Sequence, residues 1–185
     1  MLWFDQMRGG RLLSPTSFNR IYVPAPPSVK IIALRRYART FKLNSFVETG
    51  TFLGDTTAAV ANLFDLCVTI ELAPELHAQA TKRLSSLGHV SCLLGDSGAV
   101  LSRVLSDVRA PTLFWLDAHH SGGMTANAGY DPIFEELRSI YAHFVHGHVI
   151  LVDDARGHDV GRIIRETPPS YTATVRNDII RIVPG

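Results

Sequence analysis

The chain has 185 residues, 46% of them hydrophobic and 19% charged, which fits one globular domain with a substantial core. Lys and Arg number 18 against 17 Asp and Glu, and this balance predicts no nucleic-acid partner. No apolar stretch approaches the ~20 residues of a membrane span, and the first ten residues lack the order of a secretory signal. Cys67 and Cys92 lie in apolar runs and are interpreted as buried hydrophobes. We therefore expect a cytoplasmic location and no membrane partner.

The chain begins with a segment unlike the rest. Residues 1–27 contain two adjacent glycines and four prolines, which predicts an N-terminal arm and not a second domain. We expect this arm to cover an acceptor or to form the contact of a homodimer. Residues 28–41 then show helical spacing and open the single α/β domain predicted over 28–185. The apolar residues available for one face of this helix are Ile31, Ile32, Leu34 and Tyr37.

Five short apolar runs follow, and they are continuous, as expected of strands buried on both faces of a parallel sheet. The runs cover residues 46–49, 67–72, 90–96, 112–118 and 148–154. Helical patterns separate them, with Pro74 and Pro132 near helix starts and Asp96 or Ser97 as a cap. Repeated strand–helix units predict a doubly wound, mostly parallel Rossmann-like α/β sheet. YTATV and IIRIV, separated by RND, predict a C-terminal antiparallel hairpin.

The motif VETGTFLGDTT, residues 47–57, joins the first strand to the first helix. Gly50 permits a sharp turn, and Gly54 lets a ligand approach the helix N-terminus. The spacing is not the GxGxxG of a pyrophosphate cradle, and the carboxylate of Glu48 favours a cationic ligand. A tight turn with a capping acid is the alternative. The candidate ligand-binding residues here are Glu48, Thr49, Gly50, Gly54, Asp55 and Thr56.

Two further strand ends carry polar residues. Glu71 lies 21 residues after Gly50, where a carboxylate can accept both hydroxyls of a ribose, although it can also be an exposed strand-end acid. Asp96 and Ser97 can meet an adenine edge or cap a helix. This order resembles the class I S-adenosylmethionine (SAM)-dependent methyltransferases, whose first motif reads acid-x-Gly-x-x-x-Gly in several branches. The resemblance covers about residues 45–185 and implies SAM binding at these positions, with Asp117 included.

Three aspartates mark the fourth and fifth strand ends. Asp117 follows the fourth strand, and Asp153 and Asp154 follow the fifth, so the three converge if these strands are neighbours about 4.8 Å apart. Their repulsion calls for a cation, and all-oxygen ligation favours Mg²⁺, Ca²⁺ or Mn²⁺. The alternative is that Asp153 or Asp154 caps a loop. The pattern resembles catechol and macrocin O-methyltransferase-type enzymes, in which a metal holds the acceptor hydroxyl beside the methyl donor.

Two histidines follow the first of these aspartates. DAHHSGG resembles a group of small bacterial class I methyltransferases that read Asp-Ala-His-aromatic-Ser-Gly, and this implies His119 as the functional histidine. His120 takes the place of a lysine in the catechol branch and is the second candidate. A pKa of ~6.5 suits an unperturbed histidine to accept a proton near neutral pH. Residues 121–129 are a mobile loop over the acceptor or a plain connector.

These patterns together predict methyl transfer from SAM to a hydroxyl oxygen with divalent-metal assistance. The expected acceptor is a hydroxylated small molecule, such as a sugar. A nicotinamide-dependent reductase is disfavoured because the pyrophosphate cradle and a Tyr/Lys pair are missing. A metal-dependent hydrolase would leave the glycine motif and Glu71 unexplained. A non-catalytic SAM-binding module stays open.

Overall fold

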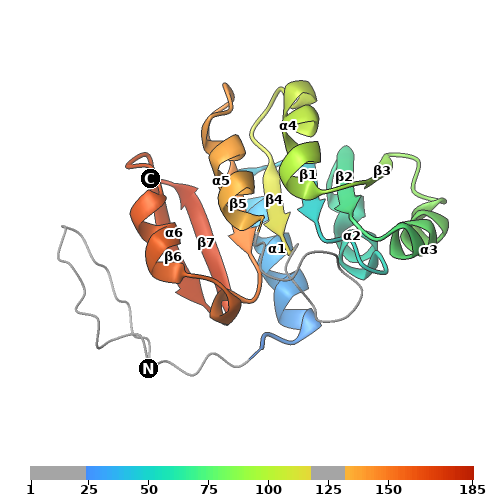
Figure 1. The fold of residues 1–185 in the computed structure, drawn as a ribbon, viewed down its shortest axis with the longest axis horizontal. Helices are drawn as coiled ribbons and strands as arrows, with labels where there is room; N and C mark the ends of the chain where they lie inside the picture. The colour runs from blue at the N-terminus through green and yellow to red at the C-terminus, as the bar shows by residue number, and fades with distance from the viewer. Residues whose placement is uncertain (1–23, 118–131) are drawn as a thin grey trace.

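A seven-stranded sheet organises the chain in the computed structural model, which describes residues 24–117 and 132–185. The strand order is β3-β2-β1-β4-β5-β7-β6 (Figure 1). The strands are β1 (Ser45–Thr49), β2 (Leu66–Glu71), β3 (Val90–Leu94), β4 (Leu113–Leu116), β5 (Val149–Val152), β6 (Tyr171–Arg176) and β7 (Ile179–Pro184). The first five are parallel, and β7 is antiparallel to β5 and β6. The predicted doubly wound sheet with a C-terminal hairpin is confirmed.

The strand order places a switch point at β1. Its neighbours are β2 on one side and β4 on the other, so the chain builds the sheet outward in both directions from this strand. In open α/β sheets, ligands bind outside the carboxyl ends of the strands at such a switch point. The ends of β1 and β4 are therefore where a site is expected.

Helices cover both faces of the sheet. They are α1 (Pro27–Phe41), α2 (Asp55–Val60), α3 (Pro74–Leu84), α4 (Ser97–Asp107), α5 (Ile133–Tyr141) and α6 (Val160–Glu166), with 3₁₀ turns η2 (Ala61–Leu63) and η3 (Ala155–Gly157). Pro74 starts α3 as predicted, because its fixed φ suits the first turn of a helix. None of the helices in the described ranges has the length and apolarity that a membrane crossing requires.

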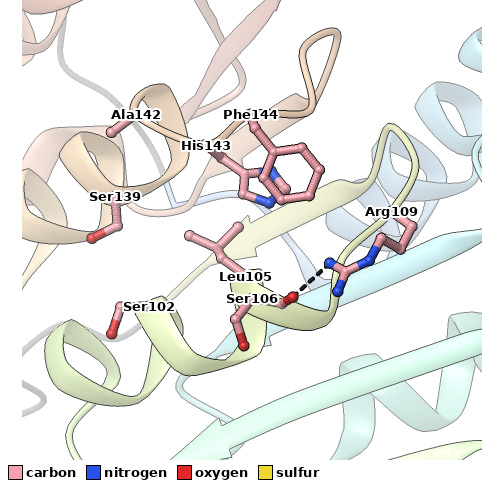
Figure 2. Close-up of a pocket in the computed structure, with 8 residues that line it drawn as sticks. All are labelled: Ser102, Leu105, Ser106, Arg109, Ser139, Ala142, His143 and Phe144. Atoms are coloured by element: carbon pink, nitrogen blue, oxygen red, sulfur yellow. Dashed lines mark hydrogen bonds between the residues drawn. The ribbon is translucent and has the colours of Figure 1, made fainter.

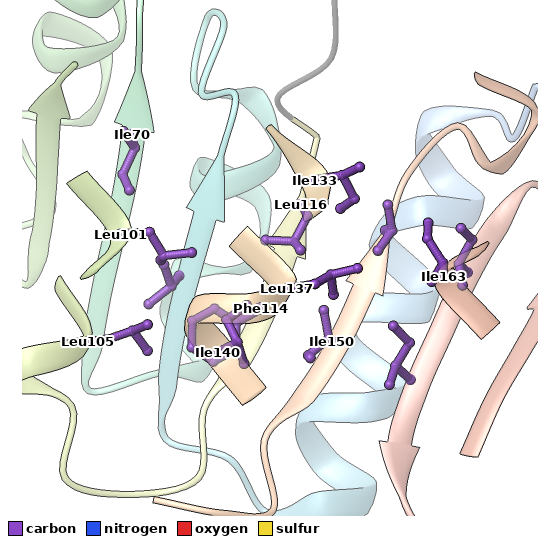
Figure 3. Close-up of a cluster of buried hydrophobic side chains, with 14 of the residues drawn as sticks. Ile70, Leu101, Leu105, Phe114, Leu116, Ile133, Leu137, Ile140, Ile150 and Ile163 are labelled. Atoms are coloured by element: carbon purple, nitrogen blue, oxygen red, sulfur yellow. The ribbon is translucent and has the colours of Figure 1, made fainter. Parts of the chain in front are cut away.

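The two faces of the sheet have separate apolar layers. The larger layer joins β1, β2, β4, β5 and β7 to α4, α5 and α6, and Figure 3 shows α4 and α5 side chains over the central strands. The other layer joins α1 and η2 to the opposite face. Along β4 the side chains alternate, with Phe114 in the first layer and Trp115 in the second, both fully buried. Burial on both faces explains the continuous apolar runs of β4 and β5. The same expectation is wrong for β3, which is partly exposed because it lies at the edge of the sheet.

Helix α1 faces the sheet differently from the sequence expectation. Its buried residues are Ala33, Leu34 and Ala38, whereas Ile32 is 65% exposed. Two small alanines thus lie on the side of the helix that packs on the sheet, and Ile32 lies outside that side. The predicted face was therefore partly wrong. The stripe at positions 34 and 38 also includes Lys30, because residues four apart lie on one side of a helix.

The hairpin at the C-terminus holds the end of β5. Its turn residues Asn177 and Asp178 both have left-handed φ, as a two-residue hairpin turn requires. The buried Asp178 carboxylate accepts the backbone N–H of Arg156 at 3.0 Å and pairs with the Arg156 guanidinium. The backbone oxygen of Asp178 accepts the N–H of Ala155 at 2.8 Å. The segment that follows β5 is thereby fixed in place.

Candidate functional site

Four of the residues predicted from the sequence lie in one row across the carboxyl edge of the sheet. Strand β1 is aligned residue by residue with β2 and β4, and β4 is aligned with β5. Beyond the last paired positions, the N–H of Asp117 donates to Thr49 at 3.0 Å and that of Asp153 donates to Leu116 at 2.9 Å. The row so formed is, in spatial order, Glu71, Gly50, Asp117 and Asp153. It crosses the switch point between β1 and β4.

Glu71 is anchored by both of its carboxylate oxygens. One oxygen accepts the backbone N–H of Phe52 at 2.7 Å, and the other accepts that of Ala73 at 2.9 Å. The residue is only 5% exposed, so the alternative of an exposed strand-end acid is wrong. Each carboxylate oxygen has a second acceptor position. Glu71 can therefore hold the turn after β1 and still accept hydroxyl groups of a ligand.

The turn after β1 needs its two glycines. Gly50 and Gly54 have φ of 78° and 79°, in the left-handed region that costs glycine nothing. A Cβ on Gly54 would lie 3.1 Å from the Leu84 side chain. Gly50 puts no side chain into the row between Glu71 and Asp117. A contact between SAM and the end of β1 stays a prediction.

The neighbouring motif residues have other contacts. Asp55 is exposed and pairs with Arg83 of α3 at 2.5 Å. Thr49 is fully buried, and its hydroxyl has no hydrogen-bond partner among the described residues. A ligand contact for Thr49, Asp55 or Thr56 stays a prediction.

Glu48 is a buried carboxyl group below this row. It is 1% exposed, and its Oε2 accepts the hydroxyls of Thr57 and Thr69, each at 2.6 Å. Burial raises the pKa of Glu48 to about 8, the two hydroxyl bonds oppose the rise, and the charges of Asp117 and Glu71 add to it. Much of Glu48 is therefore protonated at neutral pH. The two threonines, which the sequence analysis missed, fix its position by joining α2 and β2 to β1.

Lys30 of α1 reaches two of the three aspartates. Its ammonium pairs with the Asp153 carboxylate and lies 3.9 Å from Oδ1 of Asp154. Burial and the charge of Asp117 raise the pKa of Asp153 to about 6, against the opposing effect of Lys30. For Lys30, burial lowers the pKa, but the bond to Asp153 and the charges of the three aspartates outweigh it, so the pKa is raised. Both partners are thus charged at neutral pH.

The predicted metal does not fit this arrangement. Within residues 24–117 and 132–185, no three His, Cys, Asp or Glu side chains are grouped so that they could hold a metal ion. Asp154 accepts from Arg156 at 2.9 Å, and Asp153 pairs with Lys30. A cation does lie between these carboxylates, as their repulsion requires, but it belongs to a lysine. The sequence signal was the position of Lys30 on the buried stripe of α1.

The other predicted residues have mixed outcomes. The Asp96 side chain accepts the N–H of Gly98 at 2.9 Å and caps α4, so the capping interpretation is confirmed and an adenine contact stays a prediction. Ser97 is buried in the first turn of α4. His119, His120 and residues 121–129 lie outside the described residues, as do residues 1–23 of the predicted arm.

Comparisons with known proteins find similarity in the fold but not in the sequence. No protein family and no curated protein matches the sequence. Solved structures do match. An O-methyltransferase from Bacillus cereus in complex with SAH (S-adenosylhomocysteine) has a TM-score of 0.64 and 14% identity over 92% of this chain and 86% of that one. The O-methyltransferase TomG from Streptomyces achromogenes, in complex with SAM and involved in tomaymycin synthesis, has a TM-score of 0.61 and 19% identity over 85% and 80%.

A third match is the SAH-bound methyltransferase PaMTH1 from Podospora anserina, with a TM-score of 0.61 and 16% identity over 85% of this chain and 78% of that one. The chain has the methyltransferase fold. Because the sequence identities are this low, the structural matches establish the fold alone. At the level of the fold, they confirm the resemblance to class I methyltransferases drawn from the sequence.

A groove elsewhere on the methyltransferase fold lies away from this site. It is formed by the C-terminal parts of α4 and α5 (Figure 2), at the amino edge of the sheet. Its lining residues are Ser102, Leu105, Ser106, Arg109, Ser139, Ala142, His143 and Phe144. None of them belongs to the predicted site, and ligands of doubly wound sheets bind at the carboxyl edge. The groove is therefore not the candidate active site.

Proposed function

We propose that the chain transfers a methyl group from SAM to an oxygen acceptor at the carboxyl edge of the sheet. The observation that supports this most is the row that places Glu71, Gly50 and Asp117 side by side at the switch point between β1 and β4. A fold shared with SAM- and SAH-bound methyltransferases adds to it. When bound, SAM supplies an electrophilic methyl group.

The residues on the β1–β2 side of the row would bind the donor. The Glu71 carboxylate is suited to the ribose hydroxyls because it is buried and held in place by two backbone N–H groups. Glu48 lies behind the turn, and a sulfonium nearby would favour its ionised form. Donor binding would then be coupled to loss of a proton from Glu48 near neutral pH.

The residues on the β4–β5 side would face the acceptor. We assign His119 as the general base that takes the hydroxyl proton, with His120 as the second candidate, and the acceptor as a hydroxylated small molecule such as a sugar. Alignment of the two reactants and removal of this proton are the main tasks left to the protein. No step is assigned to the divalent metal predicted from the sequence, because Asp117, Asp153 and Asp154, which all lie within the described residues, are not grouped as metal ligands.

Substitution of the two histidines tests this assignment. His119→Ala should leave SAH binding intact while methyl transfer to a hydroxylated acceptor slows by roughly 10²–10⁴-fold, the scale of a lost general base. His120→Ala is the matched control and should retain most of the activity. Full activity in His119→Ala with none in His120→Ala would transfer the role to His120. SAH binding without transfer to any acceptor would favour the non-catalytic SAM-binding module.

A further inference from the structure

An internal cation neutralises the acidic end of the row. Lys30 lies in the first turn of α1, and its ammonium pairs with Asp153, 123 residues further along the chain. The Lys30 side chain is 22% exposed, whereas that of Asp153 has no exposure at all. Burying a carboxylate without a partner is strongly unfavourable, so the fold needs this ammonium where it lies.

Within residues 24–117 and 132–185, the Asp153 carboxylate has Lys30 as its charged partner. Its Oδ2 binds Lys30, and its Oδ1 is buried without a hydrogen-bond partner among the described residues. Asp117 is close enough to raise the pKa of Asp153. The ammonium therefore lies beside two of the carboxylates that a divalent ion would need as ligands, Asp153 and Asp154.

We propose that Lys30 is the resident cation of this site and excludes a divalent metal from it. An ammonium has the charge that the carboxylates require, but a dication beside it would meet direct repulsion and would have to displace it from Asp153. Divalent cations also need several oxygen ligands at once, and Asp154 is already held by Arg156 at 2.9 Å. The inference deepens the proposed function, because it makes the acceptor side of the same site independent of metal.

Mn²⁺ binding to the full chain, followed by electron paramagnetic resonance and calorimetry, tests this proposal. The wild type should bind no stoichiometric Mn²⁺. Lys30→Met removes the charge with little loss of volume, and Mn²⁺ affinity should rise by about 100-fold, the scale of removing a like charge ~4 Å away in a partly buried site. Lys30→Arg keeps a cation and should bind no more Mn²⁺ than the wild type. The exposed Lys82→Met on α3 is the matched control.

The added site should depend on Asp153. The double variant Lys30→Met/Asp153→Asn should lose the Mn²⁺ binding that Lys30→Met gains. Stoichiometric Mn²⁺ binding by the wild type that Asp153→Asn removes would overturn the proposal, and this needs no Lys30 variant to fold. Unchanged Mn²⁺ binding in a folded Lys30→Met would overturn it too. SAH binding, measured on the same samples, reports separately on the proposed function.

Discussion

Glu71 and Phe52 are joined by a 2.7 Å hydrogen bond from the backbone N–H of Phe52 to the Glu71 carboxylate. This bond ties the turn after β1 to the end of β2. Phe52 itself has a left-handed φ of 51°, which is unfavourable for a residue with a side chain, and the bond offsets part of that cost. Glu71 and the turn after β1 are therefore structurally coupled, and the acid shapes the turn that it would share with the proposed donor.

Glu71→Gln should weaken both the turn and the donor site. An amide has a single acceptor oxygen, and its NH₂ group would face one of the two N–H groups that Glu71 now accepts. We expect a loss of about 1–3 kcal/mol in the free energy of unfolding. SAH affinity should fall by about tenfold or more, measured by calorimetry. The exposed Glu75→Gln on α3 serves as the control and should change neither quantity much.

Gly54→Ala should strain the same turn. The residue has φ of 79°, and an added Cβ would lie 3.1 Å from Leu84. A cost of about 1–3 kcal/mol in stability is expected from the backbone alone, together with weaker SAH binding. Gly88→Ala is matched to it, since nothing lies within 4 Å of a Cβ there. Equal urea midpoints for the two variants would show that the turn is not constrained as described.

Glu48→Gln should change how stability depends on pH. Burial raises the pKa of Glu48 from 4.5 to about 8. Between pH 4.5 and about pH 8, Glu48 is therefore protonated in the folded chain and ionised in the unfolded chain. The stabilisation from this group is complete below about pH 4.5 and is lost as the pH rises through about 8. Glutamine mimics the protonated acid and can accept both threonine hydroxyls. The variant should therefore lose less stability than the wild type between pH 6 and pH 9 in urea titrations.

His148 should make the fold sensitive to acid. Burial, followed by the charges of His143 and His146, lowers its pKa to about 4, and its Nδ1 accepts the N–H of Thr112 at 3.1 Å. In the unfolded chain His148 is protonated below about pH 6.5, whereas in the folded chain it is protonated only below about pH 4. Stability from this group is thus lost as the pH falls across that window. The difference in free energy of unfolding between the wild type and His148→Asn, measured by urea titration, should therefore change with pH between about 6.5 and 4. A difference that does not change with pH in this range would contradict the lowered pKa of His148.

The strands could be predicted from the sequence because their signal is local. Each apolar run is short and can be recognised on its own. Because the strands are parallel, the residues that follow them lie at the same edge of the sheet, the carboxyl edge. Glu71 and Asp117 were therefore found from their positions in the chain. The capping role of Asp96 was also local, since its partner Gly98 is two residues away.

The contacts that define the site could not be predicted from local sequence patterns, because they join residues that are far apart in the chain. Lys30 and Asp153 are 123 residues apart, and their pairing depends on where α1 crosses the sheet. The burial of Glu48 depends on Thr69, which comes from another strand. The aspartates in the sequence implied a divalent metal, whereas the structure places the Lys30 ammonium beside Asp153 and Asp154. The choice between a metal and a side chain depends on three-dimensional packing.

Calorimetric titration of the full chain with SAH tests the central claim, a SAM site at the carboxyl end of β1 and β2. SAH should bind with one-to-one stoichiometry, raise the melting temperature because it binds only the folded chain, and bind much more weakly to Glu71→Ala. NADH should give no comparable heat. Binding of NADH with no response to SAH, or SAH affinity that is unchanged by Glu71→Ala, would contradict the claim.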